Sequence, residues 1–75
     1  MNHTVYVTHE VQAGIQYLRE EEMLGNGSAK VLAAQYIATA WRYGNDRAAR
    51  YWRKVLVTLR RLEQATSQAS NRSAA

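Results

Sequence analysis

The chain has 75 residues and a net charge of +4, with ten Lys and Arg residues against six acidic ones, and it contains neither cysteine nor proline. A chain of this length forms one small domain that buries only about 60% of the surface its unfolded form exposes. It has no disulfide or thiolate metal site to reinforce that core, no apolar run long enough to span a membrane and no signal-peptide pattern. We therefore expect a cytoplasmic protein that gains stability as a homodimer.

The first third of the sequence predicts one helix with clear limits. Residues 1–8 are rich in β-branched and aromatic side chains, which predicts either a short strand or an extended arm. Thr8 is a suitable N-cap for a helix over residues 9–24, in which apolar side chains recur on one face. The glycines and serine of residues 25–28 then end that helix and begin the next.

The second helix, predicted over residues 29–43, is apolar around most of its circumference. A helix of this kind is buried on more than one side, either by the other helices or by a second subunit. One apolar face carries Ala33, Ala34, Ile37, Ala40 and Trp41. The other carries Leu32, Tyr36 and Tyr43.

The third helix, predicted over residues 46–65, follows a break at Tyr43-Gly44-Asn45-Asp46. Gly44 suits the left-handed conformation that ends a helix, and Asn45 or Asp46 suits the next N-cap. One face is an apolar stripe of Ala48, Trp52, Val55, Leu59 and Leu62. The opposite face is basic and comprises Arg47, Arg50, Arg53, Lys54, Arg60 and Arg61.

These patterns predict an all-α fold: an antiparallel helical hairpin with an additional N-terminal helix, assembled as a homodimer. Residues 1–65 form the single helical domain. Residues 66–75 are small, polar and without periodicity, so we expect a flexible tail there.

No motif in the chain indicates catalysis. His3 and His9 have no Cys, Asp or Glu cluster at metal-binding spacing around them, and Glu20 to Glu22 point about 100° apart on a helix, so they cannot converge on one substrate. The glycine-rich turn at residues 25–28 lacks the strand and lysine of a phosphate-binding loop. We expect a protein that is not an enzyme and that holds no cofactor or metal.

Nucleic-acid binding is the alternative function that we keep open. A small dimeric repressor of the ribbon-helix-helix kind would have a strand at residues 3–8 followed by two helices. The side chains of that strand are poor in Arg, Lys, Asn and Gln, which read base edges. In a helix-turn-helix reading, Ala40 and Gly44 fit the register, but Arg50 and Arg53 fall where buried aliphatic residues are required.

Protein binding is the function that the aromatic residues favour, because Trp, Tyr and Arg dominate interface hot spots. We interpret Trp41 and Trp52 as core residues of the helix pair, and the tyrosines at the borders of the apolar faces as exposed anchors. The predicted partner-binding residues are Tyr36, Tyr43, Tyr51, Arg47, Arg50 and Lys54. The predicted homodimer interface comprises Leu32, Tyr36 and Tyr43.

Two resemblances bear on function. The run from Ala40 through Gly44-Asn45-Asp46 to Trp52 resembles the turn of a tetratricopeptide helical hairpin, although the spacing shifts by one residue after the glycine. The whole chain, with Trp-Arg-Tyr-Gly-Asn-Asp-Arg-Ala-Ala-Arg-Tyr-Trp-Arg at its centre, is similar to small early-region proteins of Mu-like Pseudomonas phages, among them quorum-sensing anti-activators. The second resemblance implies a helical-hairpin dimer in the host cytoplasm that inhibits a bacterial host protein, such as a LuxR-type transcriptional regulator.

Overall fold

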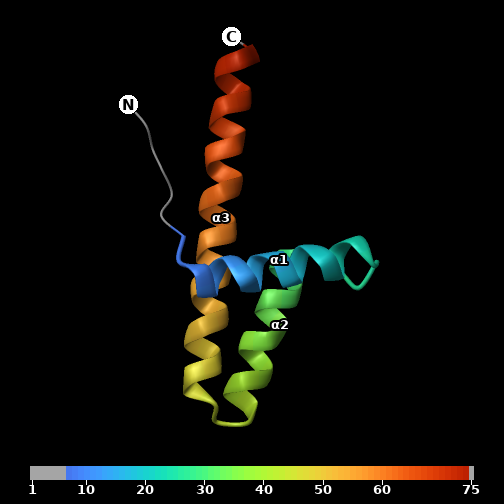
Figure 1. Ribbon diagram of the computed structural model, residues 1–75, viewed down its shortest axis with the longest axis vertical. Coiled ribbons are helices and arrows are strands. Elements are labelled where there is room, and N and C mark those ends of the chain that lie inside the picture. Colours follow the sequence, from blue (N-terminus) through green and yellow to red (C-terminus); the bar gives the residue numbers. More distant parts are fainter. Residues whose placement is uncertain (1–6, 75) are drawn as a thin grey trace.

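The computed structural model describes the backbone of residues 7–74 and the side chains of residues 7–66. The described chain is all-helical, with α1 at His9–Met23, α2 at Ala29–Arg42 and α3 at Asp46–Ala74, and it contains no strand. Figure 1 shows α2 and α3 extending side by side from the short turn that joins them and diverging as they leave it, while α1 lies across them and the last part of α3 projects beyond both. The strand or arm expected at residues 1–8 falls mostly outside the described residues.

Helix α1 begins and ends where its local sequence predicts. The Thr8 hydroxyl accepts a hydrogen bond from the Val11 N–H at 3.3 Å, which satisfies one of the free donors of the first turn. At the other end Gly25 adopts φ 81°, a left-handed conformation that is cheap only without a Cβ. The N–H groups of Gly25 and Asn26 then donate to the carbonyl oxygens of Glu22 and Glu21, both at 3.0 Å, and close a Schellman turn.

The turn between α2 and α3 repeats this device. Gly44 has φ 68°, as predicted, and its N–H donates to the Trp41 carbonyl oxygen at 3.1 Å. The Asn45 N–H donates to the Ala40 carbonyl oxygen at 2.8 Å, while the Asn45 Oδ1 accepts from the Ala48 N–H at 3.1 Å. Asn45 therefore closes one helix with its backbone and caps the next with its side chain. Ser28 caps α2 in the same way, by accepting from the Val31 N–H at 3.2 Å.

Helix α3 is longer than predicted. The sequence indicated an end near residue 65, but the helix continues to Ala74. Polar composition suggested that end, yet residues 46–74 contain no glycine or proline, and nothing in their backbone chemistry stops a helix that is already formed. The Thr66 hydroxyl donates to the Leu62 carbonyl oxygen at 3.0 Å, so this threonine is accommodated within the helix.

The core lies where the three helices meet. Leu18 of α1 and Val55 of α3 are its two largest fully buried side chains. Helices α2 and α3 share the most extensive packing, and α1 covers the junction between them. The remaining buried members of this cluster are Val11, Ile15, Ala29, Leu32, Ala33 and Leu59.

The prediction that both tryptophans form the core is wrong for Trp41. Its side chain is 66% exposed, whereas Trp52 is half-buried and packs against the core. Ala33 and Ala40 of α2 are buried, as is Leu32, and Tyr36 contacts Trp52 of α3, so the buried face of α2 passes through these residues and does not include Trp41. Trp41 follows Ala40 directly and is turned about 100° away from it, toward solvent.

A close approach between α1 and α3 fixes the position of α1. A Cβ added to Gly14 would lie 2.5 Å from the Tyr51 Oη and 2.9 Å from Val55 Cγ2, so only glycine fits at this contact. The same tyrosine hydroxyl donates to the Glu10 carbonyl oxygen at 2.7 Å. Tyr51 therefore holds α1 through both its ring and its hydroxyl.

Candidate functional site

The exposed side of α3 carries the main concentration of charge that the structure describes. All six predicted cations are exposed on this helix, as the helical periodicity of the sequence predicted. They face away from Val55 and Leu59, which point into the core. We call these six side chains the basic face: Arg47, Arg50, Arg53, Lys54, Arg60 and Arg61.

Arg50 lies at the centre of the basic face, because it lines three adjoining depressions. The largest is an open hollow between α3 and the first turn of α1, where Arg50 is joined by Tyr51 and Lys54. A shallow depression along α3 contains Val57, which is 37% exposed between cations. The third depression contains Trp41 of α2. Two exposed apolar residues therefore lie beside the basic face, in separate depressions that share Arg50.

Few carboxylates lie near enough to neutralise the positive charge of the basic face. Among the side chains of residues 7–66, the one ion pair joins Lys30 to Glu63 at 2.8 Å, and no cation of the basic face has a carboxylate within ion-pair distance. Asp46 lines the same depression as Trp41 and is the one acidic side chain there. An exposed array of positive charge of this kind attracts anionic partners over roughly one Debye length, about 8 Å at physiological salt.

The three predicted tyrosine anchors lie in different surroundings. Tyr43 is 79% exposed at the end of α2, so its side chain is open to a partner. Tyr51 is half-buried against α1, and its hydroxyl is already bonded to the Glu10 carbonyl. Tyr36 is half-buried beside Trp52, with ring centroids 4.8 Å apart. The structure therefore leaves Tyr43 as the accessible tyrosine of this set and gives the other two internal packing roles.

Tyr36 and Trp52 belong to an aromatic cluster that links all three helices. Tyr17 of α1 lies 6.4 Å from each of these two rings, and Tyr51 contacts Trp52 edge to face at 5.0 Å. A side-chain hydrogen bond with Tyr36 favours protonated Tyr17, and the negative charge of Glu21 adds to this effect, raising the pKa of Tyr17 to about 12. The Tyr17 phenol therefore stays protonated at neutral pH.

The predicted homodimer interface does not form one exposed surface. Leu32 is buried in the core, where it packs with residues of the other helices and offers almost nothing to a second subunit. Tyr36 is engaged in the aromatic cluster, so Tyr43 alone of this set is widely exposed. The homodimer itself stays a prediction. Sequence periodicity placed these three residues on one face but could not show that α1 covers part of it.

Two exposed apolar residues lie beside the basic face and are absent from the predicted partner-binding residues: Val57, and Trp41, which was predicted to lie in the core. Arg53, Arg60 and Arg61 belong to the predicted basic face but not to the predicted partner-binding residues. The signal for Val57 was present in the sequence. It lies three residues after Lys54 and four before Arg61, in the middle of the basic stripe rather than on the apolar one.

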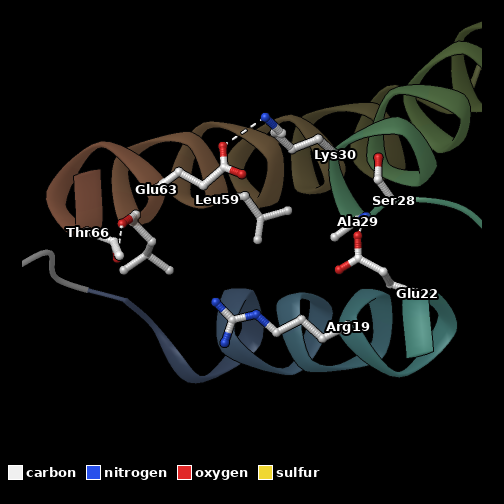
Figure 2. Close-up of a pocket in the computed structure, with 9 residues that line it drawn as sticks. Arg19, Glu22, Ser28, Ala29, Lys30, Leu59, Glu63 and Thr66 are labelled. Atoms are coloured by element: carbon white, nitrogen blue, oxygen red, sulfur yellow. Dashed lines mark hydrogen bonds and ion pairs between the residues drawn. The ribbon is translucent and has the colours of Figure 1, made fainter. Parts of the chain in front are cut away.

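A second concave site lies between α1 and the later part of α3. It is an open groove of about 270 Å³, with Leu59 and Leu62 among its lining residues. Figure 2 shows Arg19 reaching into it from α1, opposite the Lys30–Glu63 ion pair. The start of α2 also borders the groove, but there the Glu22 carboxylate already accepts a hydrogen bond from the Ala29 N–H at 3.1 Å (Figure 2).

At the α2 end of the groove, the Glu22 carboxylate has a structural role, because it binds a free N–H group at the beginning of α2. The N-terminus of a helix favours a negative group because its first N–H donors are free and its dipole is positive there. Glu22, one residue before the end of α1, supplies that group from within the chain. The carboxylate thus ties the end of α1 to the beginning of α2.

Within the described residues, no three His, Cys, Asp or Glu side chains come together as metal ligands. His9 lies at the start of α1 and lines the open hollow, while His3 falls outside the described part of the chain. None of the described helices combines the length and apolar character needed to cross a membrane.

Comparisons of the chain with protein-family models, with curated proteins and with solved structures found no match.

Proposed function

We propose that this protein is a small non-enzymatic module that binds an acidic surface of another protein through the basic face and thereby inhibits that protein. It acts as a helical hairpin of α2 and α3 with α1 packed against it, in a homodimer. The observation that carries the proposal is the array of six exposed cations around Arg50, without carboxylate partners among the described side chains and bordered by exposed Trp41.

The mixture of charge and apolar contacts supports a protein partner. Arg and Trp bind through planar, partly apolar groups that contribute strongly when water is excluded from an interface. Trp41 and Val57 lie in two separate depressions that both include Arg50 and Arg53. A partner that covers Arg50 can therefore bury apolar area in both depressions, while carboxylates of the partner pair with the guanidinium groups of this chain.

The resemblance to phage anti-activators supplies the first partner to test, a LuxR-type transcriptional regulator of the bacterial host. Binding would be measured between the two purified proteins, with Arg50→Ala/Arg53→Ala as the disabled variant. Arg19→Ala is the matched control, because it removes one exposed cation from α1, outside the basic face. We expect the double variant to lose binding by at least about tenfold, chiefly through slower association, while the control binds as the wild type does.

Double-stranded DNA is the second candidate, since cations along one helix can also contact phosphates. DNA binding predicts an affinity that falls by roughly one power of salt concentration for each phosphate contact. Fluorescence anisotropy with a labelled duplex at physiological salt distinguishes the two functions. Tight duplex binding that depends on Arg50 and Arg53 but is unaffected by Trp41→Ala and Tyr43→Ala would overturn the protein-binding proposal.

A further inference from the structure

The end of α1 presents two large apolar side chains to solvent. Met23 is 86% exposed and Leu24 is 75% exposed, although large apolar side chains are usually buried. They lie at the turn that leads into α2, at the far right of Figure 1. Three glutamates precede them directly and point in different directions around the helix, so the end of α1 carries three negative charges beside the apolar pair. We call residues 20–24 the acidic knuckle.

The acidic knuckle is held in one conformation. Gly25 closes the end of α1 with a Schellman turn, and the Glu22 carboxylate is bonded to the Ala29 N–H at 3.1 Å. These bonds fix the backbone on both sides of Met23 and Leu24, which prevents the apolar pair from folding back onto the core. The exposed pair is thus presented outward by a preorganised turn, and a partner that covers it has little ordering entropy to overcome.

The charge of the acidic knuckle restricts what can cover it. Nucleic acid and anionic lipid headgroups are repelled by three consecutive glutamates, so the complementary surface must be cationic and must contain apolar contacts. The basic face of this same chain meets both requirements. Arg50, Arg53 and Lys54 supply the charge, and exposed Trp41 and Val57 supply the apolar area.

We propose that the acidic knuckle of one copy docks on the basic face of a second copy, through Met23 and Leu24 against the apolar contacts around Arg50. The two surfaces cannot meet within one molecule, because the knuckle lies at the α1–α2 turn and the basic face points away from the core that α1 covers. The contact is therefore between two different patches, head to tail. This inference specifies the surface for the self-association named in the proposed function.

A head-to-tail contact has two consequences for assembly. Two copies that make the contact in both directions form the closed homodimer of the proposed function, whereas a contact made in one direction leaves one free knuckle and one free basic face to which further copies can add. The patches are small, which places the affinity in the weak range of interfaces below about 1,200 Å². Because opposite charges border the contact, association weakens as salt shortens the Debye length from about 10 Å at 0.1 M to about 3 Å at 1 M.

The test is complementation between two variants of the full chain. Glu20→Ala/Leu24→Ser disables the knuckle and leaves the basic face intact, while Arg50→Ala/Arg53→Ala disables the basic face and leaves the knuckle intact; neutral replacements avoid a new attraction between the two disabled surfaces. All four side chains are exposed, and circular dichroism would verify that both variants keep the wild-type helix content. Sedimentation velocity at low salt is then recorded for the wild type, for each variant alone and for their equimolar mixture.

We expect the wild type to show a mass that rises with concentration, each variant to sediment as a monomer, and the mixture to form a heterodimer that goes no further. Only a head-to-tail contact gives this pattern, since the mixture retains one working knuckle and one working basic face. A monomeric wild type, a mixture that stays monomeric, or a dimer that survives both pairs of substitutions would each overturn the proposal. Binding of the LuxR-type regulator by the knuckle variant is measured separately, so loss of self-association and loss of partner binding are distinguished.

Discussion

Replacing Gly14 with alanine tests the most constrained contact in the molecule. In an exposed helix this change would stabilise the protein by about 0.5–1 kcal/mol, because alanine loses less backbone entropy than glycine. Here the new methyl group would lie 2.5 Å from the Tyr51 Oη and 2.9 Å from Val55 Cγ2, well inside van der Waals contact. The two helices must therefore separate or the tyrosine ring must turn.

The size of the effect follows from these opposing terms. Forcing one extra methyl group into a packed contact costs about 1–3 kcal/mol. Displacing the Tyr51 ring also breaks the hydrogen bond from its hydroxyl to the Glu10 carbonyl, worth about 0.5–1.5 kcal/mol. The steric and hydrogen-bond costs exceed the gain in helix propensity, so we expect Gly14→Ala to lower the free energy of unfolding by about 0.5–4 kcal/mol.

Urea denaturation followed by circular dichroism measures this change as a lower midpoint at unchanged slope. Tyr51→Phe provides the matched background, because it removes the Oη atom at 2.5 Å while Val55 remains. The cost of Gly14→Ala should therefore be smaller in Tyr51→Phe than in the wild type. If Gly14→Ala stabilised the protein in the wild-type background, the close contact between α1 and α3 at Gly14 would be refuted.

Three further predictions concern the turn and the aromatic cluster. Gly44→Ala should lower stability by about 1 kcal/mol in the same urea assay, since φ 68° is unfavourable with a Cβ; an unchanged midpoint would contradict this. Trp52→Ala should lower the free energy of unfolding by about 2–3 kcal/mol, which is less than for a fully buried tryptophan because the side chain is half-buried. A variant as stable as the wild type would show that the contact between the Trp52 and Tyr36 rings, with centroids 4.8 Å apart, contributes nothing to stability. The contribution of Tyr17 to the free energy of unfolding should be constant up to pH of about 10 and should be lost as the pH rises toward about 12, because Tyr36 and the negative charge of Glu21 favour protonated Tyr17 and raise its pKa from 10.0 to about 12 in the folded protein. Absorbance titration should give a Tyr17 pKa closer to 10 in Tyr36→Phe than in the wild type, and an unchanged pKa would contradict this.

The sequence predicted the limits of α1 and α2 closely because those limits are set by local chemistry. Thr8 and Ser28 cap the helices with their own side chains, and Gly25 and Gly44 end helices through their own backbone conformation. None of these features depends on a distant residue. The polar composition after residue 65 predicts the end of α3 there, but the helix continues to Ala74, because a formed helix extends through small polar residues when no glycine or proline interrupts it.

The parts that could not be predicted depend on which face another helix covers. Periodicity gave α2 two apolar faces, but only the packing of α1 shows that Leu32 is buried and that Trp41 is exposed. The bond between Tyr51 and Glu10 joins residues 41 positions apart, so Tyr51 could be interpreted from sequence only as a border residue. For the candidate site, the positions of the cations followed from helical spacing, whereas the exposed apolar contacts beside them required the folded arrangement.

The order in which the helices assemble follows from the two glycine turns and from the close contact between α1 and α3 at Gly14. Helices α2 and α3 adjoin in sequence across a turn of three residues and share the most extensive packing, so they can pair early through contacts of short sequence separation. Helix α1 reaches α3 only through contacts that close a long loop, such as Gly14 with Val55. Detachment of α1 as a unit should consequently cost less free energy than separation of α2 from α3, and amide hydrogens of α1 should exchange with solvent before those in the part of α3 that packs against α2.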